Sequence, residues 1–205
     1  MFGDAESGKS AMLRAIASEI QRLYTPDKTK IFAVALRRSL LAEFPAEYLA
    51  GYLTTQDLAR DQIAALPTSL RSRLPGPDVT AEQLRSRSWW TGAEAFVLVD
   101  DDDLVATSSG NPLSPLVPLL AQAGDLGLLL VLTRRSGGAG RALHEPLLQT
   151  LSDLAAPGIM LSGNPAEGAL VGAAKPFPGV PGRGQIVTRD HGRQVIQLAF
   201  EPPAN

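Results

Sequence analysis

The hydrophobic residues of the chain form two kinds of pattern. Continuous apolar runs occupy residues 29–36, 95–99 and 127–132, and such runs are typical of strands that are buried on both faces of a parallel sheet. The segments between them place apolar residues at helical spacing. Strands that alternate with helices predict an α/β fold, in which helices cover both faces of a mostly parallel sheet.

The predicted helices follow from apolar spacing and from the residues that end them. The first covers residues 8–24, where Met12, Ile16, Ile20 and Leu23 recur at steps of four, four and three and form one apolar face. Further helices are predicted at residues 55–66, 81–86, 112–123 and 143–154.

The remaining strands are shorter. Residues 49–52 predict an edge strand or a turn, and residues 158–161 predict a fourth strand. Residues 163–184 are rich in Gly and Pro and are expected to form an ordered loop. Two runs at 185–188 and 194–200 flank an Asp-His-Gly turn signal and therefore predict a C-terminal β-hairpin.

Length and composition indicate a single domain, residues 1–205, that is expected to end at Pro202-Pro203. A chain of 205 residues with 44% hydrophobic residues can bury one good core. The formal net charge of −2 provides no general attraction to nucleic acid. The absence of cysteine excludes disulfides and thiolate metal sites, and His144 and His191 have no partner at metal-ligand spacing. No apolar run is long enough to span a membrane and no signal peptide is recognisable, so any membrane association is expected to be indirect.

The first ten residues carry the strongest motif. The stretch Gly3-Asp4-Ala5-Glu6-Ser7-Gly8-Lys9-Ser10 fits the phosphate-binding loop (P-loop) pattern G-x-x-x-x-G-K-[ST] at every fixed position, and all eight residues are candidate nucleotide ligands. The glycines let backbone N–H groups point inward as a nest for phosphates, and the following helix adds a partial positive charge. Lys9 is expected to reach the β- and γ-phosphates and Ser10 to place its hydroxyl on Mg²⁺. The alternative is a glycine turn that caps a helix.

Two features of this loop are unusual. A P-loop normally follows a buried central strand, but only Met1 and Phe2 precede Gly3. The first strand is therefore expected to be largely missing, and the chain is expected to be a segment of a longer protein. Asp4 and Glu6 place two acids in a loop for phosphate, and like charges at short range repel each other. Weak or selective nucleotide binding is one expectation that follows.

A second acidic motif ends the strand at 95–99. In Phe96-Val97-Leu98-Val99-Asp100, a buried parallel strand delivers a carboxylate to the sheet edge where the P-loop lies, so Asp100 is expected to hold Mg²⁺ together with Ser10. Asp101 stands where many ATPases place the glutamate that polarises the attacking water, and it is a catalytic candidate. The alternative is a solvated acidic turn. Asp102 and Asp103 are expected to be solvated or capping groups.

Other candidates follow later strands or the P-loop itself. Thr133 ends the next strand and is expected to sense the γ-phosphate. Arg134 and Arg135 either join the site or form structural ion pairs with the run of aspartates. Arg183, between two glycines, either reaches a neighbouring subunit's nucleotide as a catalytic arginine finger or only orders its own loop. Met12, in the helix after the P-loop, is added to the nucleotide-binding candidates.

Longer stretches extend these motifs. GDAESGKS, FVLVDDDDLV, LTRRSGG, APGIMLSGNPAEGAL and PGRGQIVTR together resemble the ATPase domains of the EccC family of type VII (ESX) secretion systems, within the FtsK/SpoIIIE branch of P-loop ATPases. The resemblance runs from residue 1 to about residue 201 and is strongest to the last of the tandem ATPase domains. It implies a RecA-like fold, ATP and Mg²⁺ held through Lys9, Ser10 and Asp100, and a cytosolic domain tethered to an inner-membrane complex.

The resemblance also implies protein partners. In that family the C-terminal ATPase domain captures small helical Esx (WXG100-type) substrates through a C-terminal export signal, which docks in an apolar surface pocket. Residues 40–74 and the loop around Leu170 are candidates for this pocket. The other ATPase domains of the same protein are further implied partners.

The chain departs from FtsK-like motors in three respects: Asp101 replaces a glutamate, Arg134 replaces a frequent glutamine, and the first strand is largely missing. Two functions therefore stay open, an ATP-hydrolysing motor domain and a module that binds nucleotide without turnover and recognises the export signal. A DNA translocase is disfavoured because the net charge is negative and no stripe of Lys and Arg is present.

Overall fold

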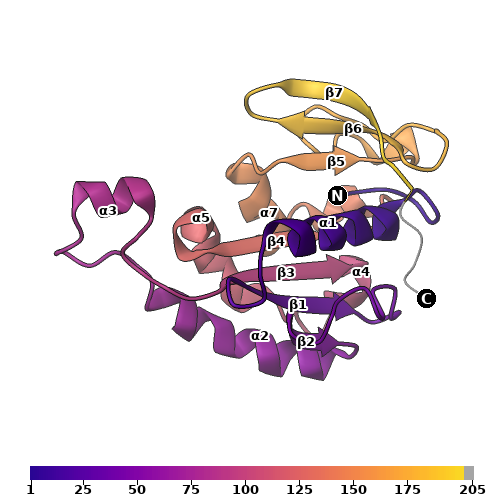
Figure 1. Cartoon of the computed structure of the whole chain (residues 1–205). Helices are drawn as coiled ribbons and strands as arrows, with labels where there is room; N and C mark the ends of the chain where they lie inside the picture. Colours follow the sequence, from indigo (N-terminus) through magenta and orange to yellow (C-terminus); the bar gives the residue numbers. More distant parts are fainter. Residues whose placement is uncertain (201–205) are drawn as a thin grey trace.

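The computed structural model of the chain describes residues 1–200. Its helices are α1 (Lys9–Leu23), α2 (Gln56–Arg71), α3 (Ala81–Ser86), α4 (Asp102–Val105), α5 (Ala123–Leu126), α6 (Ala139–Ala142) and α7 (Pro146–Asp153), with 3₁₀ helices η1 (Ser114–Gln122) and η2 (Pro165–Glu167). Its strands are β1 (Thr29–Ala35), β2 (Leu49–Leu53), β3 (Glu94–Asp100), β4 (Leu128–Leu132), β5 (Gly158–Met160), β6 (Arg183–Thr188) and β7 (Gly192–Gln197). Figure 1 shows their arrangement.

The strands form a parallel sheet and an antiparallel sheet. The parallel sheet has the order β2-β1-β3-β4, and the antiparallel sheet has the order β5-β6-β7. This arrangement confirms the predicted α/β fold with a mostly parallel sheet and a C-terminal hairpin. The Gly- and Pro-rich stretch before β6 is largely irregular, as predicted. The expected stop at Pro202-Pro203 lies outside the described residues.

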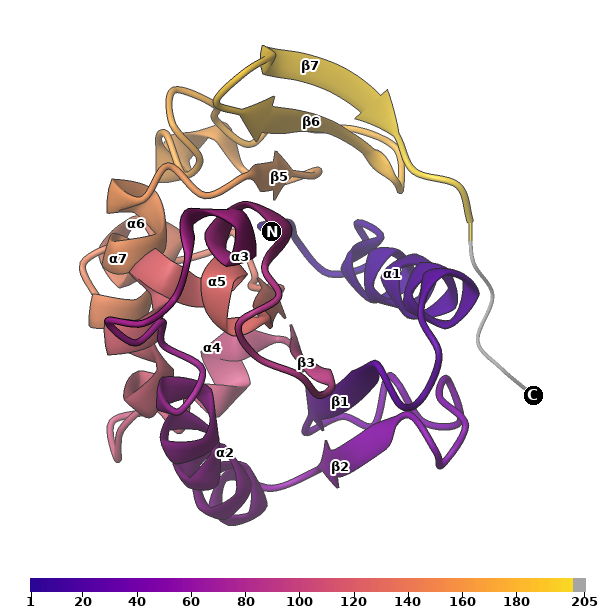
Figure 2. The same cartoon turned by 60° about the vertical axis from the view of Figure 1, so that its left-hand side comes forward.

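Two hydrophobic clusters cover opposite faces of the parallel sheet. Ile31 and Leu98 pack in the cluster that contains α1, whereas Val34 and Val97 pack in the cluster that contains α2, η1 and α7. Figure 2 shows α1 and α2 on opposite sides of the strands. All four side chains are fully buried, because successive strand residues point to opposite faces and both faces are covered.

Phe2 joins the two sheets. It forms isolated parallel bridges to Arg134, after β4, and to Met160, in β5. Its N–H donates to the carbonyl of Ile159 at 2.9 Å, and its carbonyl accepts from the N–H of Leu161 at 2.8 Å. Phe2 therefore occupies the end of a strand position between β4 and β5, and the P-loop follows it directly.

A cavity of about 500 Å³, called the slot below, lies between β4 and β5. Leu130 and Ile159 line it from the two strands, and Leu148 lines it from α7. Leu129, in the middle of the wholly apolar β4, remains 38% exposed. The prediction that β4 is buried on both faces is therefore wrong for this residue, because β4 has a regular neighbour on one side only.

The N-terminal amine lies at the end of the slot. It donates to the carbonyl of Leu132 at 2.8 Å, where a strand would place a peptide N–H. Burial lowers the pKa of the Met1 amine from 8.0 to about 5, because an ammonium loses its hydration there.

The buried face of α1 differs from the predicted one. Leu13 and Ile20 are buried against the parallel sheet, whereas Leu23 is 62% exposed. Met12 and Ile16, which the prediction placed on the buried face, line the slot and are only partly buried. The parallel sheet therefore contacts the neighbouring stripe of α1, which carries Leu13 and Ile20.

Three helices differ in their bounds or type from the prediction, and each has a proline inside it or at its start. α2 continues past Pro67 because the fully buried Leu70 extends its apolar face by another turn. The predicted helix at 112–123 is mostly 3₁₀, with Pro118 inside it, since proline cannot donate the hydrogen bond that an α-helix needs. Pro146 starts α7 and so separates it from α6.

α3 stands apart from the two sheets on an extended arm (Figure 1), and no residue of this helix is buried. A capping box between Thr80 and Gln83 satisfies its first turn, which explains why a helix forms without packing. Among residues 1–200, no helix is both long and apolar enough to cross a membrane.

Candidate nucleotide site

The P-loop runs from Phe2 into α1 and has the backbone that a phosphate nest requires. Gly8 has φ of 107°, a left-handed value that favours glycine, and a Cβ there would lie 3.2 Å from the backbone nitrogen of Gly182. A Cβ on Gly3 would collide with the side chain of Ser7. The hydroxyl of Ser7 is buried and has no hydrogen-bond partner within the described part of the chain. These features fit a loop that closes around an anion.

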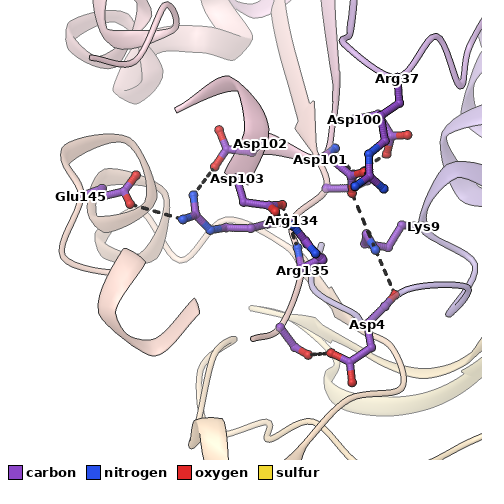
Figure 3. Close-up of polar contacts among 12 residues, drawn as sticks. Asp4, Lys9, Arg37, Asp100, Asp101, Asp102, Asp103, Arg134, Arg135 and Glu145 are labelled. Atoms are coloured by element: carbon purple, nitrogen blue, oxygen red, sulfur yellow. Dashed lines mark hydrogen bonds and ion pairs between the residues drawn. The ribbon is translucent and has the colours of Figure 1, made fainter. Parts of the chain in front are cut away.

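The two acids of the P-loop point in different directions. The Asp4 carboxylate accepts a hydrogen bond from the hydroxyl of Ser136, and the Asp4 carbonyl accepts from Lys9 Nζ at 2.9 Å (Figure 3). Glu6 is exposed. The expected repulsion of phosphate by Asp4 is therefore reduced, because its charge is directed to Ser136 rather than into the loop.

Three hydroxyl groups converge on Asp100 at the carboxyl edge of the parallel sheet. Ser10 Oγ and Ser39 Oγ donate to Asp100 Oδ2 at 2.8 and 2.5 Å, and Thr133 Oγ1 donates to Oδ1 at 2.6 Å. Thr133 also accepts from the N–H of Asp101 at 2.9 Å. Ser10 and Asp100, the predicted metal ligands, thus lie together, and the Thr133 hydroxyl is engaged by Asp100.

This group of oxygens fits Mg²⁺. Mg²⁺ prefers oxygen ligands and usually takes one or two protein groups together with phosphate oxygens and waters. Ser10 and Asp100 provide such a pair beside the P-loop. Within residues 1–200, no group of three or more His, Asp and Glu side chains could hold a metal on its own.

Asp101 lies between two cations. Lys9 Nζ is 3.8 Å from Asp101 Oδ1, and Arg37 Nη1 is 3.4 Å from Oδ2 (Figure 3). Asp101 has φ of 51°, at the turn where β3 gives way to α4. Burial, and then the neighbouring Asp100 carboxylate, raise the pKa of Asp101 above its usual value, against the opposing effect of Lys9.

The other two aspartates form ion pairs. Arg134 Nη1 contacts Asp102 Oδ2 at 2.7 Å, and its other terminal nitrogen lies 3.4 Å from Glu145. Arg135 Nε contacts Asp103 at 2.9 Å. Of the two alternatives for the arginines, the structural ion pairs are the ones observed. The prediction that Asp102 is a solvated or capping group is wrong, because its side chain is fully buried beside Arg134 and α4 has no side-chain cap.

The pKa values of these two aspartates shift in opposite directions. Burial raises the pKa of Asp102 in spite of the hydrogen bond from Arg134. Burial alone would also raise the pKa of Asp103, but hydrogen bonds from Arg135 lower it below its usual value. The difference follows from depth, since Asp103 is the more accessible of the two.

The remaining candidates lie around this centre. The Gly182 N–H donates to the carbonyl of Ser7 at 2.8 Å, so the stretch containing Arg183 contacts the P-loop backbone, although Arg183 itself is exposed. Met12 lines the slot between β4 and β5. Of the substrate-pocket candidates, Leu170 is only 5% exposed and lines the slot, whereas the stretch 40–74 presents exposed leucines.

Sequence reasoning missed three residues of this site. Ser39 and Arg37 come from the loop after β1, and Ser136 comes from the loop after β4. Their position in the chain was the signal that could have identified Arg37 and Ser39. Arg37-Arg38-Ser39 directly follows a buried parallel strand, and such loops leave the sheet at the edge that carries the P-loop.

No profile of a known protein family matches the chain. Individual proteins do match it. EccC4 of the ESX-4 secretion system of Mycobacterium tuberculosis (strain H37Rv) is 46% identical over 203 residues, which is 99% of this chain and 16% of EccC4. The ESX secretion system protein EccC of Thermomonospora curvata is 47% identical over 98% of the chain and 15% of its own length. The chain therefore spans about one sixth of these relatives.

Solved structures agree with these relatives. The cytoplasmic domain of the T. curvata type VII secretion ATPase EccC superimposes with a TM-score of 0.94 over 98% of this chain and 23% of that one. ATPases 2 and 3 of the same protein, in complex with a signal sequence peptide, give 0.93 over 98% and 36%. A structure described as an ATPase is 32% identical and gives 0.83 over 97% of this chain and 78% of that one. The chain belongs to the EccC family of type VII secretion ATPases, as one of its ATPase domains.

Proposed function

We propose that the chain is an ATP- and Mg²⁺-binding domain of a type VII secretion ATPase, which recognises small helical Esx (WXG100-type) substrates and helps to export them. The observation that carries the nucleotide part is the convergence of Lys9, Ser10 and Asp100 at one sheet edge. The P-loop beside them has a buried Ser7 hydroxyl that finds no hydrogen-bond partner among residues 1–200. Family membership supports the secretion part.

Each group of the site has a proposed role. The P-loop amides and Lys9 bind the phosphates, and Ser10 and Asp100 hold Mg²⁺, which, when bound, neutralises charge on the phosphate oxygens. Thr133 orients Asp100 through its 2.6 Å hydrogen bond and contacts the γ-phosphate side of the site. Asp101 orients the attacking water, and Arg183 acts on the nucleotide of a neighbouring ATPase domain.

The nucleotide proposal is tested by calorimetric titration of the chain with ATP and Mg²⁺. Lys9→Ala is expected to abolish measurable affinity because it removes the one lysine of the P-loop. Lys28→Ala, which removes an exposed lysine elsewhere, is the matched control and should bind like the unmodified chain. Equal affinity in the two variants would contradict the site.

The alternative function is a module that binds nucleotide without turnover. The pairing of Asp101 with Lys9 and Arg37 in the chain without nucleotide favours it, because a carboxylate that stays between two cations is not directed at a water. Phosphate release from ATP separates the two functions when it is measured with and without a substrate. Binding without turnover under both conditions would leave only the module, and turnover stimulated by substrate would support the motor.

Substrate recognition rests on a relative. A signal sequence peptide is bound in the complex of T. curvata EccC ATPases 2 and 3, which match this chain at 47% identity. We expect a fluorescent export-signal peptide of an Esx protein to bind the chain, and a scrambled peptide to bind far more weakly. Duplex DNA serves as the comparison for a translocase, and a salt-dependent affinity for DNA above that for the peptide would reverse the assignment.

In the working protein we place this domain inside a longer polypeptide, in the cytoplasm and attached to the membrane through the secretion complex. The much greater length of the relatives supports the first part.

A further inference from the structure

The loop after β1 brings two groups to the site that no sequence motif marks. In the register of β1 and β3, Ala35 lies opposite Asp100, so the loop leaves the sheet beside the acids. Ser39 donates to Asp100, and Arg37 pairs with Asp101. The loop therefore forms one wall of the nucleotide site.

The position of Asp101 identifies where an anion is stabilised. Its two carboxylate oxygens lie 3.8 Å from Lys9 Nζ and 3.4 Å from Arg37 Nη1. Both separations exceed the usual length of a charged hydrogen bond, so these are loose ion pairs that a better acceptor can replace. Lys9 belongs to the P-loop and is expected to meet phosphate, so the second cation of the pair lies within reach of the same phosphate.

We infer that Arg37 is a further nucleotide-binding residue, which holds the terminal phosphate of ATP together with Lys9 after that phosphate has displaced Asp101 from between them. The inference rests on the proposed nucleotide-binding function. A phosphoryl group has more charge and more acceptor oxygens than a carboxylate, and the guanidinium fork matches it in two hydrogen bonds. The Arg37 side chain is 60% exposed, so nothing in its packing prevents the movement.

This exchange has two consequences. ADP lacks the terminal phosphate, so Arg37 keeps its pairing with Asp101 and contributes nothing to ADP affinity. ATP frees the Asp101 carboxylate at the moment when the phosphate is in place. Asp101 thus competes with ATP for Lys9 and Arg37 before ATP binds. Afterwards its carboxylate is free to contact other groups.

The test compares Arg37→Ala with Arg38→Ala, its exposed neighbour in the chain. Both variants remove one positive charge from the same loop, so Arg38→Ala controls for the effect that any lost charge has on nucleotide affinity. We expect Arg37→Ala to weaken ATP binding by about tenfold or more, as for the loss of a hydrogen bond to a charged group. Its ADP affinity should stay within about twofold of that of Arg38→Ala. Arg37→Gln, which keeps length without charge, should behave like Arg37→Ala.

A second variant tests the displacement itself. Asp101→Asn keeps the shape of the side chain but removes the anion that competes with phosphate, so ATP affinity should rise by about threefold or more. A fall in ATP affinity would overturn the displacement. Equal effects of Arg37→Ala on ATP and ADP, or equal effects of Arg37→Ala and Arg38→Ala, would overturn the role of Arg37 while leaving the nucleotide site intact. An unmodified chain that binds no ATP would overturn both the inference and the proposed function.

Discussion

The parallel and antiparallel sheets meet at Phe2 but differ in how deeply they are buried. Ile31, Val97 and Leu98 of the parallel sheet are fully buried between two layers of helices. β7 of the antiparallel sheet is exposed along almost its whole length, and Val195 is 67% exposed. Figure 1 shows β7 at the outer edge of the molecule. Hydrophobic burial therefore places most of the stability in the parallel sheet.

β6 and β7 contribute position more than burial, whereas Met160 of β5 is fully buried in the cluster that also contains Val97. The antiparallel sheet supplies β5, which pairs with Phe2, and the Gly182 N–H, which bonds the P-loop at Ser7. The acids and Thr133 come from the parallel sheet, so the site is assembled across the junction. The parallel sheet thus contributes most of the buried apolar area, whereas the stretch around β6 fixes the backbone of the P-loop. The following substitutions test this difference.

The largest expected effect comes from the core of the parallel sheet. Leu98→Ala should lower the free energy of unfolding by about 3 kcal/mol, because it leaves a cavity in a fully buried position. Val195→Ala in β7 should change it by less than about 0.5 kcal/mol. Urea denaturation measures both. Similar losses in the two variants would contradict the difference in stability between the buried strands of the parallel sheet and β7.

The next effect concerns the slot. Adding Val-Ile-Val-Ile-Val before Met1 should raise the free energy of unfolding by on the order of 2 kcal/mol, since apolar burial exceeds the ordering entropy. Val-Ile-Pro-Ile-Val is the matched control, because proline interrupts the ladder on both sides. Both extensions convert the Met1 amine into an amide, so the difference between them reports strand insertion alone. Equal stability of the two extended chains would contradict insertion.

A smaller effect distinguishes position from stability at Gly182. Gly182 and Gly192 both have positive φ, 76° and 64°, so alanine at either should cost about 1 kcal/mol in backbone strain. A Cβ on Gly182 would also lie 2.9 Å from Gln197 Nε2, whereas one on Gly192 would meet nothing within 4 Å. We expect only Gly182→Ala to weaken ATP binding, because only Gly182 bonds the P-loop. Equal ATP affinity in the two variants would contradict this role.

The smallest effect is a dependence on pH. The folded chain holds the Met1 amine with a pKa of about 5, below the ordinary 8.0, so the unfolded chain binds the proton first as pH falls. Stability should therefore be full above pH 8 and begin to decline as the pH falls below 8. A charged Met1 can leave its hydrogen bond to Leu132 for solvent at a cost of about 1 kcal/mol, which limits the whole loss to that amount and confines it to roughly the first pH unit below 8. Thermal melts at several pH values measure it, and N-terminal acetylation should remove it.

The predicted site residues that the structure brings together share a local signal. Lys9 and Ser10 follow from spacing inside the P-loop, and Asp100 follows from its place at the end of an apolar strand. Their meeting at the sheet edge is a consequence of parallel topology, which the pattern of strands and helices already indicates. The Ser10–Asp100 contact could therefore be expected although 90 residues separate the pair.

The misses have different physical causes. Ser39 and Arg37 contact the acids through loop conformation, and no periodic pattern specifies a loop. Met12 and Ile16 are apolar at helical spacing, but spacing does not tell which of two adjacent stripes faces the sheet. Met12 and Ile16 line the slot, so the position between β4 and β5 explains why these two residues are apolar.

Gly182 accepts a hydrogen bond from the N–H of Leu198 at 2.8 Å and donates one to Ser7 at 2.8 Å. The stretch after β7, one glycine and the P-loop are thus connected in series. A force applied to the chain at Leu198 would load these two bonds one after the other. The P-loop is therefore mechanically coupled to the stretch that follows β7, and a displacement of that stretch would act on the loop through Gly182.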